Sequence, residues 1–251
     1  MEWLTFRTAD AAIATNESYK SIAVTRGRMD PAKVFVVRSG PKLDRMRIVA
    51  PVPALKKGRR YLIGYVGVMG KQEGIDLLLQ SAARIVREMG MTDVHFGLVG
   101  SGTSLEQVKA YVEQLGIGDH VTFTGRVSDQ QMLEMLNTAD VCVNPDLANE
   151  LNDKSTMNKI MEYMALAKPI VQFDLAEGRF SAQDASLYAK PNDVRDLAEK
   201  IVALLRDPEQ RRRMGEFGRR RIEQELEWRH EAPKLLAAYD SVFSASSARV
   251  R

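Results

Sequence analysis

The strongest constraint on the fold is an alternation, from Arg60 onward, of short apolar runs with longer runs of helical apolar period. The apolar runs predict buried strands at 61–67, 94–100, 120–125, 140–145 and 169–174. The longer runs predict helices at 74–90, 104–116, 128–139 and 155–167, and residues 192–243 are expected to be almost wholly helical, with breaks at Asp207-Pro208 and near Trp228. Strands separated by helices imply right-handed crossovers. We therefore expect an α/β fold, a Rossmann-like parallel sheet with helices on both faces.

A smaller pattern precedes this series. Strand-like runs at 9–16 and 33–40 flank a helical run at 17–29, which predicts a partial βαβ segment too small to close a core alone. Residues 46–60 carry two prolines and several basic residues without a clear period, as in a linker. We expect four segments: 1–45, the linker 46–60, a complete α/β domain at 61–228, and a C-terminal helix and tail at 229–251.

Composition narrows the classes of function. The 251 residues are 45% hydrophobic and 27% charged, as in ordinary globular proteins. No apolar run approaches the roughly 20 residues that span a bilayer, and the first residues lack the apolar core of a signal peptide, so we expect a cytoplasmic protein. One cysteine, Cys142, and three scattered histidines provide no metal-ligand set, so no metal bound by the protein is expected.

The basic residues form two clusters, 55–60 and 211–221. A net charge of +3, without interleaved aromatic residues, gives no support to nucleic-acid binding. The second cluster alternates with apolar positions at helical spacing, which favours a solvated helix face. Peripheral contact with the inner face of a membrane is the alternative.

Ligands of open parallel sheets bind beyond the carboxyl ends of the strands, and four loops there are candidates. The first, 67–74, has three glycines before a helix and suits a phosphate, with Gly67, Val68 and Lys71 as candidate contacts; a simple tight turn is the alternative. The second, 100–107, resembles a dinucleotide fingerprint, but Leu105 stands where the third glycine belongs, which disfavours NAD. The third places Arg126 at a strand end, although a surface arginine is the commoner explanation.

A fourth loop, in "NDKSTMNKIMEYMALAKPIV" (152–171), places polar residues before an apolar helix. A helix beginning near Ser155 would direct free N–H groups at the ligand edge, with the Ser155 and Thr156 hydroxyls beside them. Lys159 and Glu162 are three residues apart, and therefore share a face with Asn158. Lysine can neutralise a phosphate and a carboxylate can bind a ribose diol, which together fit a nucleotide. The alternative is a capped helix with a surface Lys–Glu pair.

The ordered set "YVGVMGKQEGIDLLLQSA", "VHFGLVGSG", "HVTFTGRV", "TADVCVNPD" and "NDKSTMNKIMEYMALAKPIVQFD" resembles the donor-binding domain of the GT-B glycosyltransferases of family four. Residues 8–27 and 34–46 resemble the end of that family's acceptor-binding domain, and 226–243 its C-terminal helix. The resemblance implies half of a GT-B fold, with 1–45 as a remnant of the acceptor domain. It also implies a retaining enzyme that uses a nucleoside diphosphate sugar and no cofactor.

The resemblance assigns Glu162 to the nucleotide ribose. It places Lys154, beside Asp153, where the family has a first glutamate that contacts the donor sugar. Ser155, Thr156 and Met157 match the part of the motif that faces the sugar and diphosphate, and Asp153 is the candidate acid in place of the missing glutamate. Glu73 stands where the family commonly has lysine, and Lys71 is a displaced candidate for the diphosphate.

The implied function is transfer of a sugar to a glycan or lipid-linked acceptor in the biosynthesis of surface polysaccharide or glycolipid. The family's catalytic histidine belongs to an earlier part of the acceptor domain, and no histidine here matches its context, so the catalytic residues are unassigned. The alternative is a non-catalytic donor-binding module, or an accessory subunit that needs a separate acceptor domain.

Overall fold

The computed structural model describes residues 2–249, and of residues 244–249 only the backbone. Its centre is a six-stranded parallel sheet in the order β5-β4-β3-β6-β7-β8. The strands are β3 (Tyr61–Val66), β4 (Val94–Val99), β5 (Val121–Gly125), β6 (Val141–Asn144), β7 (Ile170–Phe173) and β8 (Ser186–Ala189). The predicted α/β fold, with its parallel sheet, is confirmed.

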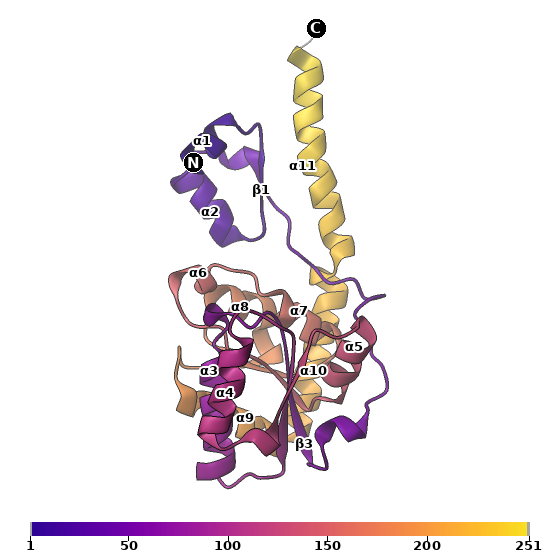
Figure 1. The fold of residues 1–251 in the computed structure, drawn as a ribbon. Helices are drawn as coiled ribbons and strands as arrows, with labels where there is room; N and C mark the ends of the chain where they lie inside the picture. The colour runs from indigo at the N-terminus through magenta and orange to yellow at the C-terminus, as the bar shows by residue number, and fades with distance from the viewer. Residues whose placement is uncertain (1, 250–251) are drawn as a thin grey trace.

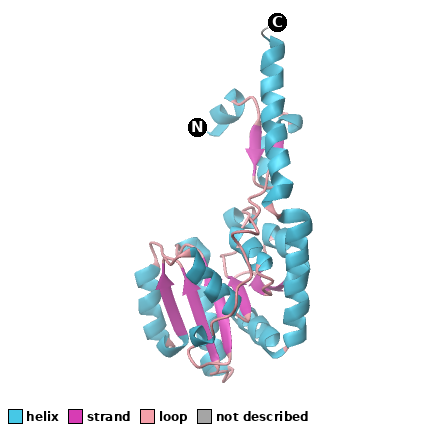
Figure 2. Ribbon diagram, turned by 90° about the vertical axis from the view of Figure 1, so that its right-hand side faces the viewer, coloured by secondary structure: helices cyan, strands magenta, loops and turns pink. Residues whose placement is uncertain are grey.

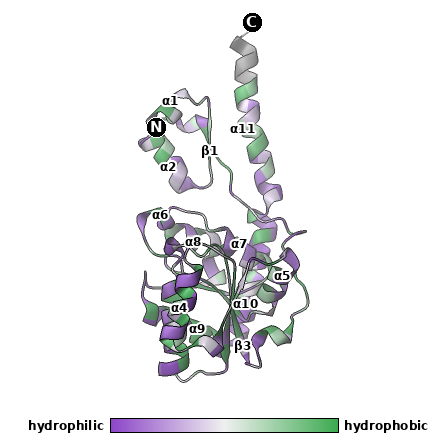
Figure 3. Cartoon of the chain, in the orientation of Figure 1, coloured by the Kyte–Doolittle hydropathy of each residue, from purple (hydrophilic) through white to green (hydrophobic). Residues whose placement is uncertain are grey.

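Helices cover both faces of this sheet (Figure 1). They are α3 (Ile75–Ala83), α4 (Leu105–Leu115), α5 (Asp129–Thr138), α6 (Glu150–Asp153), α7 (Asn158–Ala165), α8 (Ala176–Ala182), α9 (Val194–Arg206) and α10 (Pro208–Arg221). Apolar side chains of α3, α4 and α9 form one core with alternate strand residues, and those of α5 and α7 form the other. The helices carry their polar residues outward (Figure 3). Strands that are apolar on both faces are what a sheet covered on both sides requires.

Three predicted details differ from the structure. The helix expected from Ser155 begins at Asn158, because 154–157 form a separate turn after α6. Strand β8 and helix α8 were not predicted; the two middle residues of β8 are only partly buried, so β8 lacks the continuous apolar run that identified the equally short β6 and β7. By contrast, the predicted start of the helix at 128–139 agrees with α5, which Ser128 caps in a capping box with Gln131.

The N-terminal elements form a second, smaller unit. Helix α1 (Glu2–Thr8), strand β1 (Ala12–Ala14), helix α2 (Glu17–Thr25) and strand β2 (Val34–Val36) precede the large sheet, and β1 pairs with β2 in parallel, as the predicted βαβ segment requires. The long helix α11 (Trp228–Arg249) contacts β2. The strand arrows of the large sheet point toward this unit, so the carboxyl ends of the strands face it (Figure 2).

The arginines of α10 are mostly paired within the helix. Arg212 bonds Glu209 and Glu216, and Arg219 bonds Glu223. Such i,i+3 and i,i+4 pairs are typical of a solvated helix face, so the basic cluster at 211–221 is largely occupied by intrahelical contacts. Within residues 2–249, no helix combines the length and the apolar character needed to cross a membrane.

His95 gives a pH-dependent prediction. Its side chain is buried on β4, and its Nε2 lies 2.8 Å from the Thr122 hydroxyl. Burial, aided by the charges of Lys57 and Arg59, lowers the His95 pKa from 6.5 to about 4. The folded state therefore favours neutral imidazole, so this contribution to stability is complete above about pH 6.5 and is lost as the pH falls toward about 4. The loss can reach about 3 kcal/mol.

His95→Gln is expected to reduce the dependence of the free energy of unfolding on pH between about pH 6.5 and 4. Urea unfolding at pH 7 and at pH 4.5 should show a smaller acid loss of stability in the variant than in the wild type, because glutamine does not titrate. Equal losses in the two proteins would contradict the burial argument.

Candidate functional site

The order in which the chain adds strands to the sheet reverses between β3 and β6. The candidate site lies at the carboxyl ends of these two strands. From β3 the chain order runs outward through β4 and β5, and from β6 it runs the other way through β7 and β8. Open α/β sheets bind ligands in the crevice at such a switch point. The loop after β3, the loop after β6 and the start of α7 all meet here.

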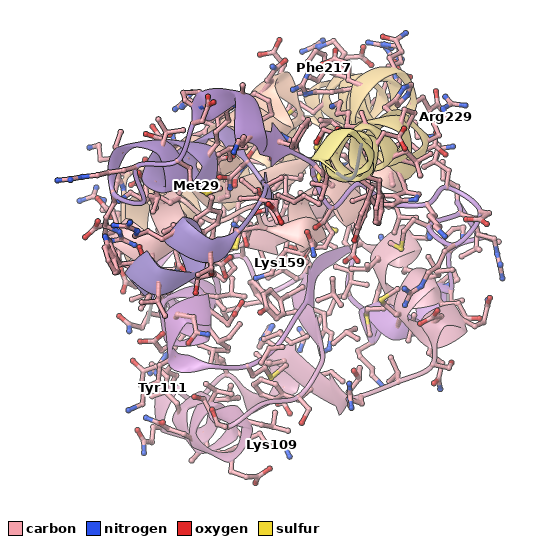
Figure 4. The ribbon with its side chains drawn as sticks, turned by 90° about the horizontal axis from the view of Figure 1, so that it is seen from above. Met29, Lys109, Tyr111, Lys159, Phe217 and Arg229 are labelled. Atoms are coloured by element: carbon pink, nitrogen blue, oxygen red, sulfur yellow. The ribbon has the colours of Figure 1, made fainter. Side chains whose placement is uncertain are left out.

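Lys159 is the central side chain of this region (Figure 4). Its Nζ lies 2.7 Å from Glu73 Oε2 and 2.8 Å from Asp146 Oδ1, and all three side chains are largely buried. The surface Lys–Glu pair considered for α7 is therefore not the arrangement found: Lys159 reaches across the crevice to the loops after β3 and β6. Two of its three N–H donors are used by these carboxylates.

Glu162 points to a different part of the same edge. It lines a pocket of about 360 Å³ together with Asn158, Trp228 and residues 39–42, 45 and 46. Burial raises the pKa of Glu162, while the charges of Arg45 and Lys159 oppose this shift. The structure thus brings Asn158 and Glu162 together at one pocket, as the helical spacing predicted, and directs Lys159 to a neighbouring cluster.

The turn before α7 is held by the N-terminal unit. Asn16, fully buried, donates from Nδ2 to the Lys154 carbonyl at 2.8 Å and to Thr156 Oγ1 at 2.9 Å. The Tyr19 hydroxyl lies 2.9 Å from Ser155 Oγ, and Ser155 Oγ donates to the Leu151 carbonyl. These bonds hold the turn outside the helix, which explains why α7 starts at Asn158, after the extended Met157.

Lys154, at the position where the family has its first glutamate, and the neighbouring Asp153 have local partners here. Asp153 Oδ1 accepts a bond from the Ala176 N–H, at the first residue of α8. Lys154 Nζ lies 2.7 Å from Glu150 on α6, and this pair is largely exposed. Both side chains therefore contribute to the local structure of the loop in which they lie.

The glycine loops after β3 and β4 pack on each other. A Cβ on Gly100 would lie 1.9 Å from the Gly67 carbonyl oxygen, and one on Gly102 would lie 2.4 Å from that of Met69. Close backbone contact thus accounts for the Gly-x-Gly that suggested a dinucleotide. Gly74 has φ +61 and faces the Pro145 carbonyl, which fixes the loop after β3 against the loop after β6.

Gly67 lies beside Lys159, since a Cβ added there would lie 3.3 Å from Lys159 Cε, whereas Lys71 and Arg126 make no contact with Lys159 among the described residues. Val68 is 61% exposed, and Lys71 lines a separate cavity of about 290 Å³ against α4, on the side of Tyr111, which Figure 4 shows at the periphery. Arg126 is exposed after β5, and β4 and β3 separate that strand from β6. The structure therefore does not bring Lys71 and Arg126 to the Lys159 cluster.

Sequence reasoning missed two contributors, Asp146 and Asn16. Asp146 lies two residues after β6, and its position directly after a predicted strand was a usable signal. Asn16 reaches the turn across 138 positions of sequence, and no local pattern marks that contact.

Residues 60–207 match the family described as Glycosyl transferases group 1. Similar characterised proteins include an alpha-maltose-1-phosphate synthase of Mycolicibacterium smegmatis, 27% identical over 93% of this chain, and an alpha-D-kanosaminyltransferase of Streptomyces kanamyceticus, 26% identical over 62% of it. The chain covers 64% of the first protein and 39% of the second.

Solved structures share the fold at lower identity. Sucrose-phosphate synthase of Thermosynechococcus elongatus has a TM-score of 0.78 at 22% identity, and the match covers 97% of this chain and 61% of that one. Anabaena HepE in complex with UDP-glucose has a TM-score of 0.78 at 16% identity, covering 96% of this chain and 65% of that one.

Proposed function

The chain belongs to the Glycosyl transferases group 1 family, and from that premise we propose that its large α/β unit binds the nucleoside diphosphate sugar of a glycosyltransferase reaction. The sugar would pass, with retention of configuration, to a glycan or lipid-linked acceptor, in the biosynthesis of a surface polysaccharide or glycolipid. The observation that carries the proposal is the pocket of about 360 Å³ that holds Glu162 and Asn158 at the carboxyl edge of the sheet.

The pocket suits the nucleoside part of such a donor. Its volume falls within the usual range for small-molecule sites, about 300–1,000 Å³. A carboxylate in a half-buried position can accept two hydrogen bonds from a ribose diol, and binding of that kind would favour the ionised form that burial now disfavours. Glu162 is accordingly proposed as the ribose contact.

The diphosphate would lie toward Lys159 and the start of α7. The third N–H of Lys159 and the unpaired N–H groups of the helix start are the charge-compensating groups nearest the crevice. We propose that these groups, rather than a metal bound by the protein, stabilise the leaving diphosphate. Ser155, Thr156 and Met157 would shape the sugar side through the turn that Asn16 holds.

A non-catalytic donor-binding module is the second candidate. It shares the donor site but transfers nothing, so nucleotide binding without turnover of a UDP-sugar or GDP-sugar would favour it. Peripheral contact with a membrane is less favoured, because Arg212, Arg213, Arg219 and Arg221, four of the six arginines of α10, pair with glutamates three or four residues away.

Glu162→Ala is expected to weaken UDP or GDP binding by tenfold or more, since bonds to a charged group contribute about 1.5–3 kcal/mol each. Burial raises the Glu162 pKa, so the ionised carboxylate lowers the stability of the fold and its removal should not lower the melting temperature. Titration calorimetry would measure both nucleotides, with the exposed Glu106→Ala as the matched control. If neither nucleotide binds to the wild type, the proposed donor site is wrong.

A further inference from the structure

The Lys159 cluster carries more negative than positive charge. Lys159 contributes one positive charge, and Glu73 and Asp146 contribute two negative charges when both are ionised. Tyr65 closes the cluster from β3: its hydroxyl lies 3.4 Å from Glu73 Oε2, and its ring lies 5.2 Å from the lysine Nζ. Glu162, on the same helix as Lys159, adds a further acid nearby.

The cluster is also sealed from water on its β6 side. The Asp146 side chain is 1% exposed, and the Lys159 and Glu73 side chains are 10% and 17% exposed. Among the buried side-chain atoms of residues 2–243, Asp146 Oδ2 and both amide atoms of Asn144 have no hydrogen-bond partner. A buried carboxylate oxygen without a donor is costly while the group is ionised.

A diphosphate that approaches Lys159 would therefore meet an excess of negative charge. Coulomb repulsion between buried like charges is weakly screened, so the site must lose a negative charge before it gains a dianion. A proton is the smallest species that can supply this neutralisation. Asp146 is the natural acceptor, since it is the most buried of the acids and has an oxygen free to become an O–H donor.

We propose that Glu73 and Asp146 are positioning residues that hold Lys159 ready for the donor's diphosphate, and that diphosphate binding is coupled to the uptake of one proton by this carboxylate pair. The proposal rests on the proposed donor site and adds its proton linkage. Protonation leaves Lys159 balanced by a single carboxylate, so its third N–H can bond a phosphate oxygen.

The titration of Asp146 supports this coupling. Burial raises its pKa from 3.8 to about 7; Lys159 opposes the shift and the neighbouring Glu73 adds to it. Near neutral pH the free protein thus contains a mixture of protonated and ionised forms. An incoming diphosphate raises this pKa further, because it adds negative charge. The dissociation constant should then increase with pH above about 7, by up to tenfold per pH unit.

The test is calorimetric titration of the protein with UDP between pH 6 and 8.5, in two buffers that differ in ionisation enthalpy. For each UDP bound, the wild type should take up as much as one proton more than Asp146→Asn does. The affinity of the variant for UDP should also vary less with pH. The titration of UDP itself is common to both proteins and cancels in the comparison. Glu106→Gln, which removes an exposed acid on α4, should behave as wild type.

Equal proton uptake by wild type and a folded Asp146→Asn overturns the coupling and leaves the proposed donor site intact. Failure of wild type to bind UDP or GDP at any pH overturns the donor site and the coupling together. If Asp146→Asn does not fold, Glu73→Gln provides the same comparison, because Glu73 shares Lys159 and is more exposed. Lys159→Arg should keep the proton uptake, since the cationic charge is retained.

Discussion

Arg38→Met is expected to lower the free energy of unfolding by about 3–5 kcal/mol, because it leaves a buried carboxylate without its cation. Arg38 Nη1 lies 3.2 Å from Glu177 Oε2, and the two side chains are 7% and 6% exposed. The guanidinium also lies 3.9 Å from the centre of the Phe180 ring. Methionine keeps an apolar stem but neither contact, so Glu177 retains only the Ser18 hydroxyl among its side-chain bonds.

This pair joins the N-terminal unit to the large sheet. Arg38 follows β2, Glu177 belongs to α8, and Ser18 on α2 bonds the same carboxylate. Loosening this connection should also weaken the bonds of Asn16 to the turn before α7. We therefore expect the variant to bind nucleotide less tightly even at temperatures where it is folded.

Urea denaturation would measure the effect of Arg38→Met against two references. The exposed pair of Arg45 and Asp129 gives the first, and Arg45→Met should cost less than about 1 kcal/mol. The double variant Arg38→Met/Glu177→Gln should recover part of the loss, because it removes the unpaired charge. A loss no larger than that of Arg45→Met would show that the buried pair does not stabilise the fold.

Gly100→Ala is expected to be comparably destabilising, by about 3 kcal/mol or more. Its φ of +133 is a conformation that residues with a Cβ rarely adopt, and the added carbon would lie 1.9 Å from a backbone oxygen, that of Gly67. Backbone atoms cannot rotate away as a side chain can, so the loop after β3 must move. That loop continues to Glu73, the partner of Lys159, and nucleotide binding should weaken as well.

Gly90→Ala is the control that separates the cost of a positive φ from the cost of a steric clash. Gly90 has φ +67, and nothing lies within 4 Å of an added Cβ, so this variant meets only the backbone cost of about 1–2 kcal/mol. Thermal unfolding of both variants should give a melting temperature for Gly100→Ala that is well below that of Gly90→Ala. Equal melting temperatures would mean that the two loops can separate without cost.

The fold could largely be predicted from the sequence, because its signals are local. The alternation of apolar runs and helical runs located β3 to β7 and the start of α5. The structure added α8 and β8, and β8 lacks the continuous buried run that marked the equally short β6 and β7. The start of α7 was misplaced, since a bond from Asn16 to the Thr156 side chain overrides the local preference of the turn.

The candidate site, like the fold, was predicted from the sequence only in part. The sequence by itself determined that Asn158, Lys159 and Glu162 share a helix at the carboxyl edge of a parallel sheet, because helical spacing and strand order follow from neighbouring residues. Only the tertiary structure decided that Lys159 binds Glu73, 86 positions away, and that the turn before α7 is held from Asn16, 138 positions away. Contacts of this kind depend on how the chain packs, and packing brings together side chains that no local pattern relates.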